Sequence, residues 1–197
     1  MSLTINYHKQ FSKEFNDFLI ILSKISEIKG IKNLPFNIDI LSKSKELENI
    51  LQDKGYYELL LFSNITKKYQ TVKIVLLKKL KSNYAISKGA SLYSKQKKLL
   101  NNKLNVIFSP KLLSKNNSLC SEFIFGFLLK SYTFDKYKTN KKNVIINSIN
   151  IFSSKNIKLK NLIYLNNLYT AINFCKDLVS EPANKLYPKS YADKCLK

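Results

Sequence analysis

The run Tyr-Gln-Thr-Val-Lys-Ile-Val-Leu-Leu at residues 69–77 constrains the fold of this 197-residue chain more than any other segment. It is rich in β-branched side chains, which predicts a β-strand. It is also apolar almost without interruption, as strands are when helices cover both faces of a sheet. Residues 69–77 are therefore expected to form a strand in the interior of a sheet.

Other segments alternate between the two kinds of regular structure. Strands are expected at residues 3–7, 36–41, 56–63, 104–108 and 143–152. Helices are expected at residues 11–30, 46–53, 87–101, 159–179, and from a cap at Asn117 or Ser118 to about residue 132. The first helix rests on aromatic and aliphatic residues spaced four, three, four and three apart, namely Phe11, Phe15, Phe18, Leu22 and Ile25. Strands alternating with helices predict an α/β domain with a mixed, mostly parallel sheet covered on both faces.

Two prolines define the C-terminal region. Pro182 lacks an amide hydrogen and disfavours helical angles at the preceding residue, so the helix of residues 159–179 should stop near residues 179–180. Pro188 can occupy the first turn of a second helix. The second helix would run to Lys197 without a capping signal, as if the chain continued. The longer helix is expected to have one apolar face, formed by Leu162, Leu165, Leu168, Ile172, Cys175 and Val179.

The net charge of +21 comes from 34 basic and 13 acidic side chains. A surplus of this size is typical of proteins that bind nucleic acid or anionic membranes. All the basic residues are lysine, however, and the chain is also rich in asparagine and isoleucine. A/T-rich codons encode all three residue types, so base composition can account for the charge without a ligand. The absence of arginine, which makes bidentate contacts with phosphate and guanine, further weakens the nucleic-acid interpretation.

Other composition features exclude several classes of protein. No run of apolar residues approaches the 18 or more that a membrane-spanning helix requires. Cys120, Cys175 and Cys195 form no Cys-x-x-Cys pair and are expected to be reduced thiols in a cytosolic protein. His8 has no second imidazole with which to form a histidine metal site, so it is expected to be structural or exposed.

Two blocks resemble one known family. The first, Lys176-Asp-Leu-Val-Ser-Glu-Pro-Ala-Asn-Lys-Leu-Tyr-Pro188, is similar to the interdomain hinge of the leucyl (cytosol) aminopeptidases, whose pattern is close to Arg-Asp-Leu-Val-Asn-x-Pro-x-Asn-x-Leu-x-Pro. The second, Gly126-Phe-Leu-Leu-Lys-Ser-Tyr-Thr-Phe-Asp-Lys-Tyr-Lys138, resembles the family's Gly-x-x-Leu-x-x-Tyr-x-Phe-x-x-Tyr-Lys. Lys176 and Ser180 depart conservatively from the pattern. The separation of the blocks also resembles that in the family.

The resemblance implies a three-layer, macrodomain-like α/β sandwich followed by a long linking helix. It implies an N-terminal domain at residues 1–155, a linking helix at 156–180, and at 181–197 a hinge with the truncated start of a catalytic domain. The whole family enzyme is cytoplasmic and hexameric, and it releases N-terminal amino acids from peptides with two divalent ions, zinc or manganese. The implied partners are thus the chain's own catalytic domain and further copies of itself.

No catalytic, cofactor-binding or metal-binding residue is expected within the chain. A two-metal peptidase needs several convergent carboxylates, whereas Glu46, Glu48 and Asp135 stand among lysines as solvated charges. The family's catalytic blocks, Val-Gly-Lys-Gly-x-x-Phe-Asp-Ser-Gly-Gly and Asn-Thr-Asp-Ala-Glu-Gly-Arg-Leu, do not occur. A macrodomain-like fold raises the possibility of ADP-ribose binding. However, the strand end that carries glycines in that family reads Leu77-Lys-Lys-Leu80 here, which disfavours a close approach of pyrophosphate.

Three functions of different classes stay open from sequence. The chain is expected to be the structural N-terminal part of an aminopeptidase and inactive by itself. The first alternative is a stand-alone basic module that binds nucleic acid with a steep dependence on salt. The second is a truncated product without function, whose last helix would be left partly exposed.

Overall fold

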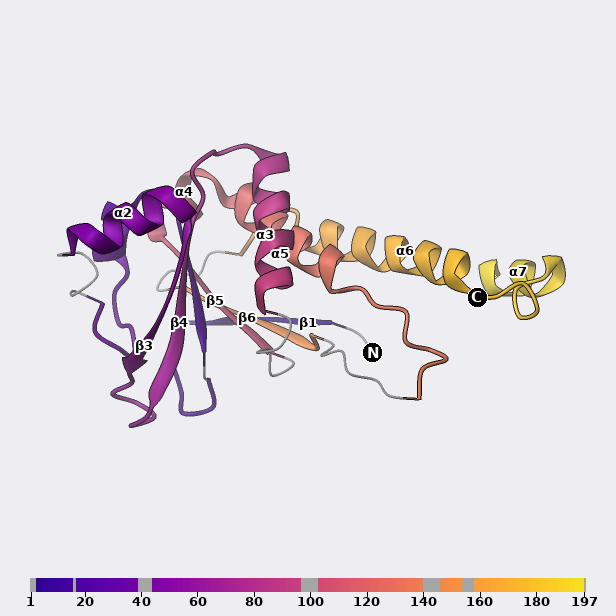
Figure 1. Ribbon diagram of the computed structural model, residues 1–197, viewed down its shortest axis with the longest axis horizontal. Coiled ribbons are helices and arrows are strands. Elements are labelled where there is room, and N and C mark those ends of the chain that lie inside the picture. Colours follow the sequence, from indigo (N-terminus) through magenta and orange to yellow (C-terminus); the bar gives the residue numbers. More distant parts are fainter. Residues whose placement is uncertain are drawn as a thin grey trace.

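The computed structural model describes residues 3–15, 17–38, 44–96, 103–139, 146–153 and 158–196. Its centre is a six-stranded sheet with the spatial order β1-β6-β5-β2-β4-β3 (Figure 1). All neighbouring strands are parallel except β3 and β4, which pair antiparallel. The strands are β1 (Thr4–His8), β2 (Phe18–Leu22), β3 (Tyr56–Phe62), β4 (Tyr69–Leu76), β5 (Lys103–Phe108) and β6 (Ser148–Phe152).

Helices cover both faces of the sheet, so the expected three-layer α/β class is confirmed. One face packs against α3 (Ser82–Gln96), α4 (Pro110–Lys115) and α5 (Asn117–Ser131). The other packs against the 3₁₀ helix η1 (Ile25–Gly30) and α2 (Lys45–Lys54). The two C-terminal helices are α6 (Leu162–Ser180) and α7 (Pro188–Cys195). None of the described helices has the length and apolar character needed to cross a membrane.

The strand predicted at residues 69–77 is β4, and it lies inside the sheet between β2 and β3. Its alternate side chains enter different layers: Val75 packs toward α3 and α5, whereas Ile74 packs toward η1 and α2. Both are almost completely buried. Burial on both sides explains why the sequence of this strand is continuously apolar rather than alternating.

The helix predicted for residues 11–30 is wrong, because Phe18–Leu22 forms the central strand β2. Asp17, immediately before it, has a φ of 55°, which a continuing right-handed helix does not allow. Its carboxylate accepts a hydrogen bond from the amide of Thr71 at 3.0 Å, and its carbonyl accepts one from the side chain of Asn105 at 3.3 Å. These contacts from β4 and β5 fix Asp17 at the start of β2. The helical spacing of the phenylalanines instead reflects their clustering around Phe152.

Several boundaries differ from the sequence expectations. The helix predicted at residues 87–101 begins at Ser82, and residues 97–101 lie outside the described ones. The cap of α5 is Asn116 rather than Asn117 or Ser118, and it makes no side-chain capping bond. The preceding helix α4, which was not predicted, is capped by Ser109, whose hydroxyl accepts from the amide of Leu112.

Two predicted strands are only partly within the described residues. Of residues 36–41, Phe36 forms an isolated bridge with Ser63, and residues 39–41 lie outside the described part. Of residues 143–152, β6 begins at Ser148, and residues 143–145 are likewise outside it. The other predicted strands and the helix at residues 46–53 agree with β1, β3, β5 and α2 within two residues at each end.

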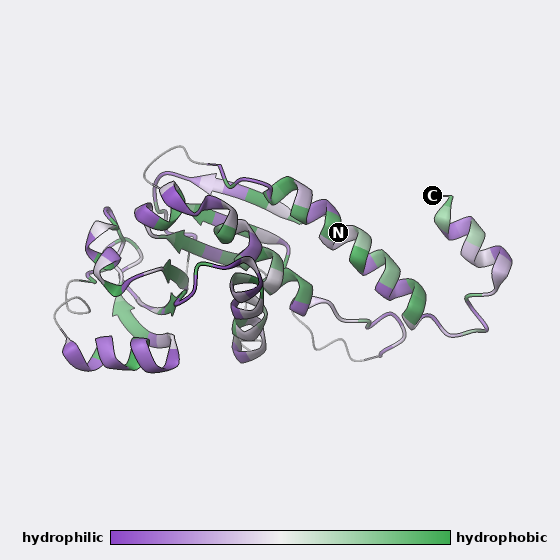
Figure 2. Cartoon of the chain, turned by 90° about the horizontal axis from the view of Figure 1, so that it is seen from above, coloured by the Kyte–Doolittle hydropathy of each residue, from purple (hydrophilic) through white to green (hydrophobic). Residues whose placement is uncertain are grey.

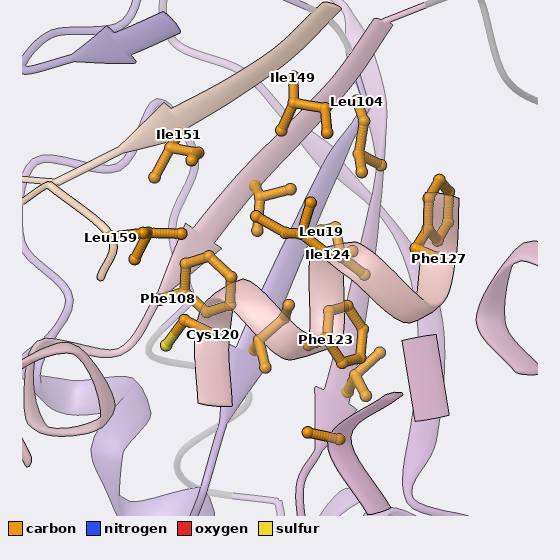
Figure 3. Packing of buried hydrophobic residues seen from close by; sticks show 14 of the residues in the cluster. Leu19, Leu104, Phe108, Cys120, Phe123, Ile124, Phe127, Ile149, Ile151 and Leu159 are labelled. Atoms are coloured by element: carbon orange, nitrogen blue, oxygen red, sulfur yellow. The ribbon is translucent and has the colours of Figure 1, made fainter. Parts of the chain in front are cut away.

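Helix α5 lies against the sheet and forms much of the larger core (Figure 3). Phe123 and Phe127 are fully buried, and they meet strand residues that include Leu19, Leu104 and Ile149. Helix α3 crosses α5 closely enough that backbone meets backbone. A Cβ on Gly89 would stand 2.0 Å from the carbonyl oxygen of Phe123, and one on Gly126 would stand 2.0 Å from that of Ile86. Only glycine therefore fits at these two positions.

Helix α6 runs away from the body of the sheet and leads to α7 at the far end of the molecule (Figure 1). The face of this helix that was predicted to be apolar is buried only at its beginning. Leu162 is buried in the larger core, but Cys175 is exposed and Val179 is 87% exposed. Seen from above, apolar residues recur along the outstretched part of α6 (Figure 2).

Candidate interdomain hinge

The two blocks that resemble the aminopeptidase family lie in contact. The hydroxyl of Tyr132, just beyond α5, donates a 2.8 Å hydrogen bond to the carboxylate of Asp177 in α6. The ammonium of Lys176 lies 4.9 Å from the centre of the Tyr132 ring and donates to the carbonyl of Leu129 at 3.4 Å. Burial and the hydrogen bond to Asp177 raise the pKa of Tyr132. These contacts hold the C-terminal end of α6 against the end of α5.

Glu181 is the centre of a second set of contacts, one residue beyond the end of α6. Its carboxylate accepts hydrogen bonds from the ammonium of Lys136, the hydroxyl of Tyr137 and, at 3.0 Å, the ammonium of Lys194 in α7. Its side chain is only 3% exposed. The bonds from Lys136, Tyr137 and Lys194 lower the pKa of Glu181 to about 2. One carboxylate therefore joins α6, α7 and the segment that follows α5.

The hinge itself follows the prediction from the two prolines. Helix α6 ends at Ser180, and Glu181 adopts an extended conformation before Pro182. A turn follows in which the amide of Leu186 donates to the carbonyl of Pro182 at 3.0 Å. Pro188 then opens α7, and the hydroxyl of Ser190 accepts from the amide of Tyr187 at 2.9 Å. Backbone and side-chain bonds thus define the path of the hinge.

A hollow of about 320 Å³ lies between the two blocks. Apolar groups of Phe134, Phe174 and Leu178 line it beside the carboxylates of Asp177 and Glu181. Among the described residues, no three histidine, cysteine, aspartate or glutamate side chains converge to hold a metal ion. The hollow combines apolar groups with carboxylates and with the ammonium groups of Lys136 and Lys194.

The residues that the sequence analysis considered for chemistry are dispersed. Glu46 and Glu48 lie in the first turn of α2, and Asp135 pairs with Lys138 at 2.8 Å. His8 stacks on Phe152 with ring centres 5.2 Å apart, and it lies 3.3 Å from the amide oxygen of Asn150. All three cysteines are free thiols, with Cys120 buried and the other two exposed.

Open α/β sheets bind ligands at the carboxyl ends of their parallel strands, and the described residues there enclose only a small hollow. The hollow beside β5 and β6 has about 30 Å³ of free volume and is lined in part by Phe11, Phe108 and Phe152. Ligand pockets are typically about 300–1,000 Å³. At the ends of β2 and β5, the buried carboxylate of Glu27 accepts a 2.6 Å bond from Ser109. A nucleotide pyrophosphate would meet a carboxylate and aromatic rings at this place.

Sequence reasoning identified the two blocks but not Glu181 or Lys136, because the family pattern leaves both positions unspecified. The sequence spacing of acidic residues and tyrosines in the two blocks could have indicated these contacts. Asp177 and Glu181 are four residues apart at the end of a helix, so their side chains share one face. Tyr132 and Tyr137 are hydroxyl donors five residues apart in the other block. The two carboxylates of one block could therefore have been matched with the two tyrosine hydroxyls of the other as hydrogen-bond partners.

Known proteins resemble the chain in both sequence and fold. A probable cytosol aminopeptidase of Ehrlichia ruminantium (strain Gardel) is 29% identical over 149 residues, which are 71% of this chain and 29% of that protein. The probable cytosol aminopeptidase of Rickettsia canadensis is 36% identical over 73 residues, which are 35% of this chain and 15% of that protein. The chain therefore matches less than a third of the length of these relatives. No protein-family model matches it.

A solved structure of a variant tomato leucine aminopeptidase has the same fold, with a TM-score of 0.62 at 13% identity. The superposition covers 98% of this chain and 41% of that one. Its N-terminal domain likewise has a mixed, mostly parallel six-stranded sheet with flanking helices. By sequence and fold together, the chain resembles the N-terminal domain of the cytosol aminopeptidase family.

Proposed function

We propose that this chain is the non-catalytic N-terminal part of a leucyl-aminopeptidase-like metalloexopeptidase. Its organisation would be an α/β domain at residues 1–155, a linking helix at 156–180, and a hinge with the start of the catalytic domain at 181–197. The whole enzyme would release N-terminal amino acids from peptides in the cytoplasm, as a hexamer. The chain's own work is to support and orient the catalytic domain.

The observation that carries this proposal is the apolar, uncovered surface of α6. Ile163 is 80% exposed and Val179 is 87% exposed, and Phe174 lies between them along the helix. Lys176 and Asp177 are the only charged residues of α6, although charged residues make up 24% of the whole chain. An apolar helix surface is normally packed against another part of the protein. Because the described part of this chain covers α6 only where it meets α5, another domain would cover the rest.

The hinge contacts support the same role. Glu181 ties α7 to the segment after α5 through Lys194 and Lys136, so the direction in which the chain leaves α6 is fixed. A catalytic domain that begins at α7 would thereby be held in one orientation relative to the sheet. Two zinc or manganese ions would be bound by that domain. The described residues of this chain bring together no cluster of ligands for them.

A peptidase assay tests the division of labour. The purified chain, supplied with Mn²⁺ or Zn²⁺ and leucine p-nitroanilide, should release p-nitroaniline no faster than the metal-containing buffer. The full-length Ehrlichia ruminantium relative is assayed in parallel. Hydrolysis by that protein would show that the conditions support peptidase activity. Metal-dependent hydrolysis by the purified chain at a rate well above the buffer would overturn the non-catalytic assignment.

A further inference from the structure

Several lysines converge beside the turn that joins α2 to β3, far along the chain from the hinge. Tyr84, Lys88 and Lys95 are spaced four and seven residues apart on α3, so they lie on one face of that helix. The ammonium of Lys88 lies 5.8 Å from the centre of the Tyr84 ring, and that of Lys95 lies 5.2 Å from the centre of the Tyr56 ring. Each of the two lysines on this face of α3 therefore lies near a tyrosine ring, one from α3 and one from β3.

Gly55 brings a third lysine into the group. The Nζ of Lys88 and the Cε of Lys78 lie 3.1 and 3.5 Å from the point where a Cβ of residue 55 would stand. Gly55 has a φ of 65°, and the missing side chain leaves room for both lysine side chains. Lys88 is only half-exposed, so its ammonium has lost part of its hydration. Burial, Lys95 and Lys78 together lower the pKa of Lys88.

The ion pairs of the described residues involve Lys136, Lys138 and Lys194, and none reaches Lys78, Lys88 or Lys95. Glu58 lies nearby, but its carboxylate accepts a 2.6 Å hydrogen bond from the hydroxyl of Tyr56 and forms no ion pair with the three lysines. The C-terminal end of α2 attracts cations, and the ammonium of Lys78 donates to the carbonyl of Asp53 there at 2.8 Å. A helix end has the equivalent of about half a negative charge, so it compensates at most one of the three lysines.

We propose that Lys78, Lys88 and Lys95 form a binding site for a phosphate group beside the Gly55 turn. A phosphate monoester has close to two negative charges at pH 7 and three acceptor oxygens, which suits several ammonium groups better than a single carboxylate does. Lysine binds phosphate as a point charge and needs no bidentate geometry. The phosphate can belong to a small phosphorylated molecule or to a polynucleotide backbone. The Tyr84 and Tyr56 rings beside the lysines offer apolar surface to the rest of the ligand.

Comparing the effects of two anions on the melting temperature of the full chain tests the site. Inorganic pyrophosphate should raise the melting temperature above that in chloride of equal ionic strength. The double variant Lys88→Gln/Lys95→Gln should bind pyrophosphate about tenfold more weakly, as expected for the loss of charge-assisted hydrogen bonds. The matched control Lys29→Gln/Lys111→Gln removes the same charge from exposed positions elsewhere and should bind like the wild type. Equal effects of pyrophosphate and chloride, or equal losses in both double variants, would overturn the proposal.

Folding of the variants and the source of the phosphate need separate measurements. Lys95 is exposed, so Lys95→Gln should keep the wild-type melting temperature in chloride and still bind pyrophosphate more weakly. Unchanged binding in that correctly folded variant would contradict the site.

A fluorescent oligothymidylate then distinguishes a polynucleotide backbone from a small phosphorylated molecule as the source of the phosphate. If the site binds a polynucleotide backbone, the oligothymidylate binds, and the slope of log affinity against log salt concentration becomes shallower by about one for each lysine removed. For a small ligand, pyrophosphate binds at concentrations at which the oligonucleotide does not.

Discussion

At the scale of single residues, two buried or nearly buried carboxylates organise different parts of the molecule. Glu27 ties the 3₁₀ helix to the ends of two strands through Ser23 and Ser109. Glu181 ties the hinge to the segment after α5. Hydrogen bonds from positive or hydroxyl groups favour the ionised form of a carboxylate, so both sites depend on charge as well as shape.

The Glu181 contacts make the stability of the chain dependent on pH. Because the pKa of Glu181 falls from an ordinary 4.5 to about 2, its contribution to folding is fully present above pH 4.5 and is lost as the pH falls toward 2. Glu181→Gln should destabilise the chain at neutral pH. The difference in unfolding free energy between the wild type and Glu181→Gln, measured by urea titration, should shrink between pH 5 and pH 2.5. Glu14→Gln, on the exposed surface, is the control, and a difference that is constant with pH would contradict the account.

Ser109 has two roles, because its hydroxyl caps α4 and donates to Glu27. Burial raises the pKa of Glu27, but the bonds from Ser109 and Ser23 outweigh burial and lower it. Ser109→Ala should cost about 1–3 kcal/mol, because a buried carboxylate loses a donor and a helix loses its cap. Thermal unfolding at pH 7 measures this cost. Ser114→Ala, which removes an exposed hydroxyl from the same helix, should change the unfolding free energy by less than about 0.5 kcal/mol.

At the scale of elements, the sequence predicted strands and helices well where one interpretation fits the local pattern. The continuously apolar residues 69–77 became β4, and the prolines at 182 and 188 ended and began helices as expected. The helix predicted at residues 11–30 was wrong because the spacing of the phenylalanines fits a helix. Contacts from β4 and β5 instead fix residues 18–22 as a strand. Those strands are distant in sequence, so a local pattern does not contain them.

The contact between α3 and α5 gives the sharpest prediction at this scale. Gly89→Ala and Gly126→Ala each place a methyl group against the backbone of the other helix, which cannot move like a flexible side chain. Each should destabilise the chain by more than about 3 kcal/mol, the upper part of the range for overpacking. Gly30→Ala is the matched control, because nothing lies within 4 Å of the added Cβ. Urea unfolding checks the order, and similar values for Gly89→Ala and Gly30→Ala would contradict the close crossing.

At the scale of the whole molecule, the sequence predicted where the hinge lies but not the contacts that fix its geometry. The resemblance identified Asp177, Tyr132 and Tyr137, but not that Tyr132 bonds to Asp177 and Tyr137 to Glu181. The sequence also predicted an apolar face on α6 without indicating what would cover it. In the structure Val179 and most of its neighbours on α6 face outward. Periodicity reports that a helix face is apolar, and it does not report which domain covers that face.

The most direct test of the central claim is whether the surface of α6 binds a catalytic domain. The purified chain and the C-terminal portion of the Ehrlichia ruminantium relative, produced separately, are mixed and their complex is measured by sedimentation. We expect a one-to-one complex that Val179→Asp abolishes and Leu60→Asp, at an exposed apolar position on β3, leaves intact. The relative's own N-terminal portion serves as the positive control. If that portion binds and this chain does not, or if Leu60→Asp weakens the complex as much as Val179→Asp, α6 is not the docking surface.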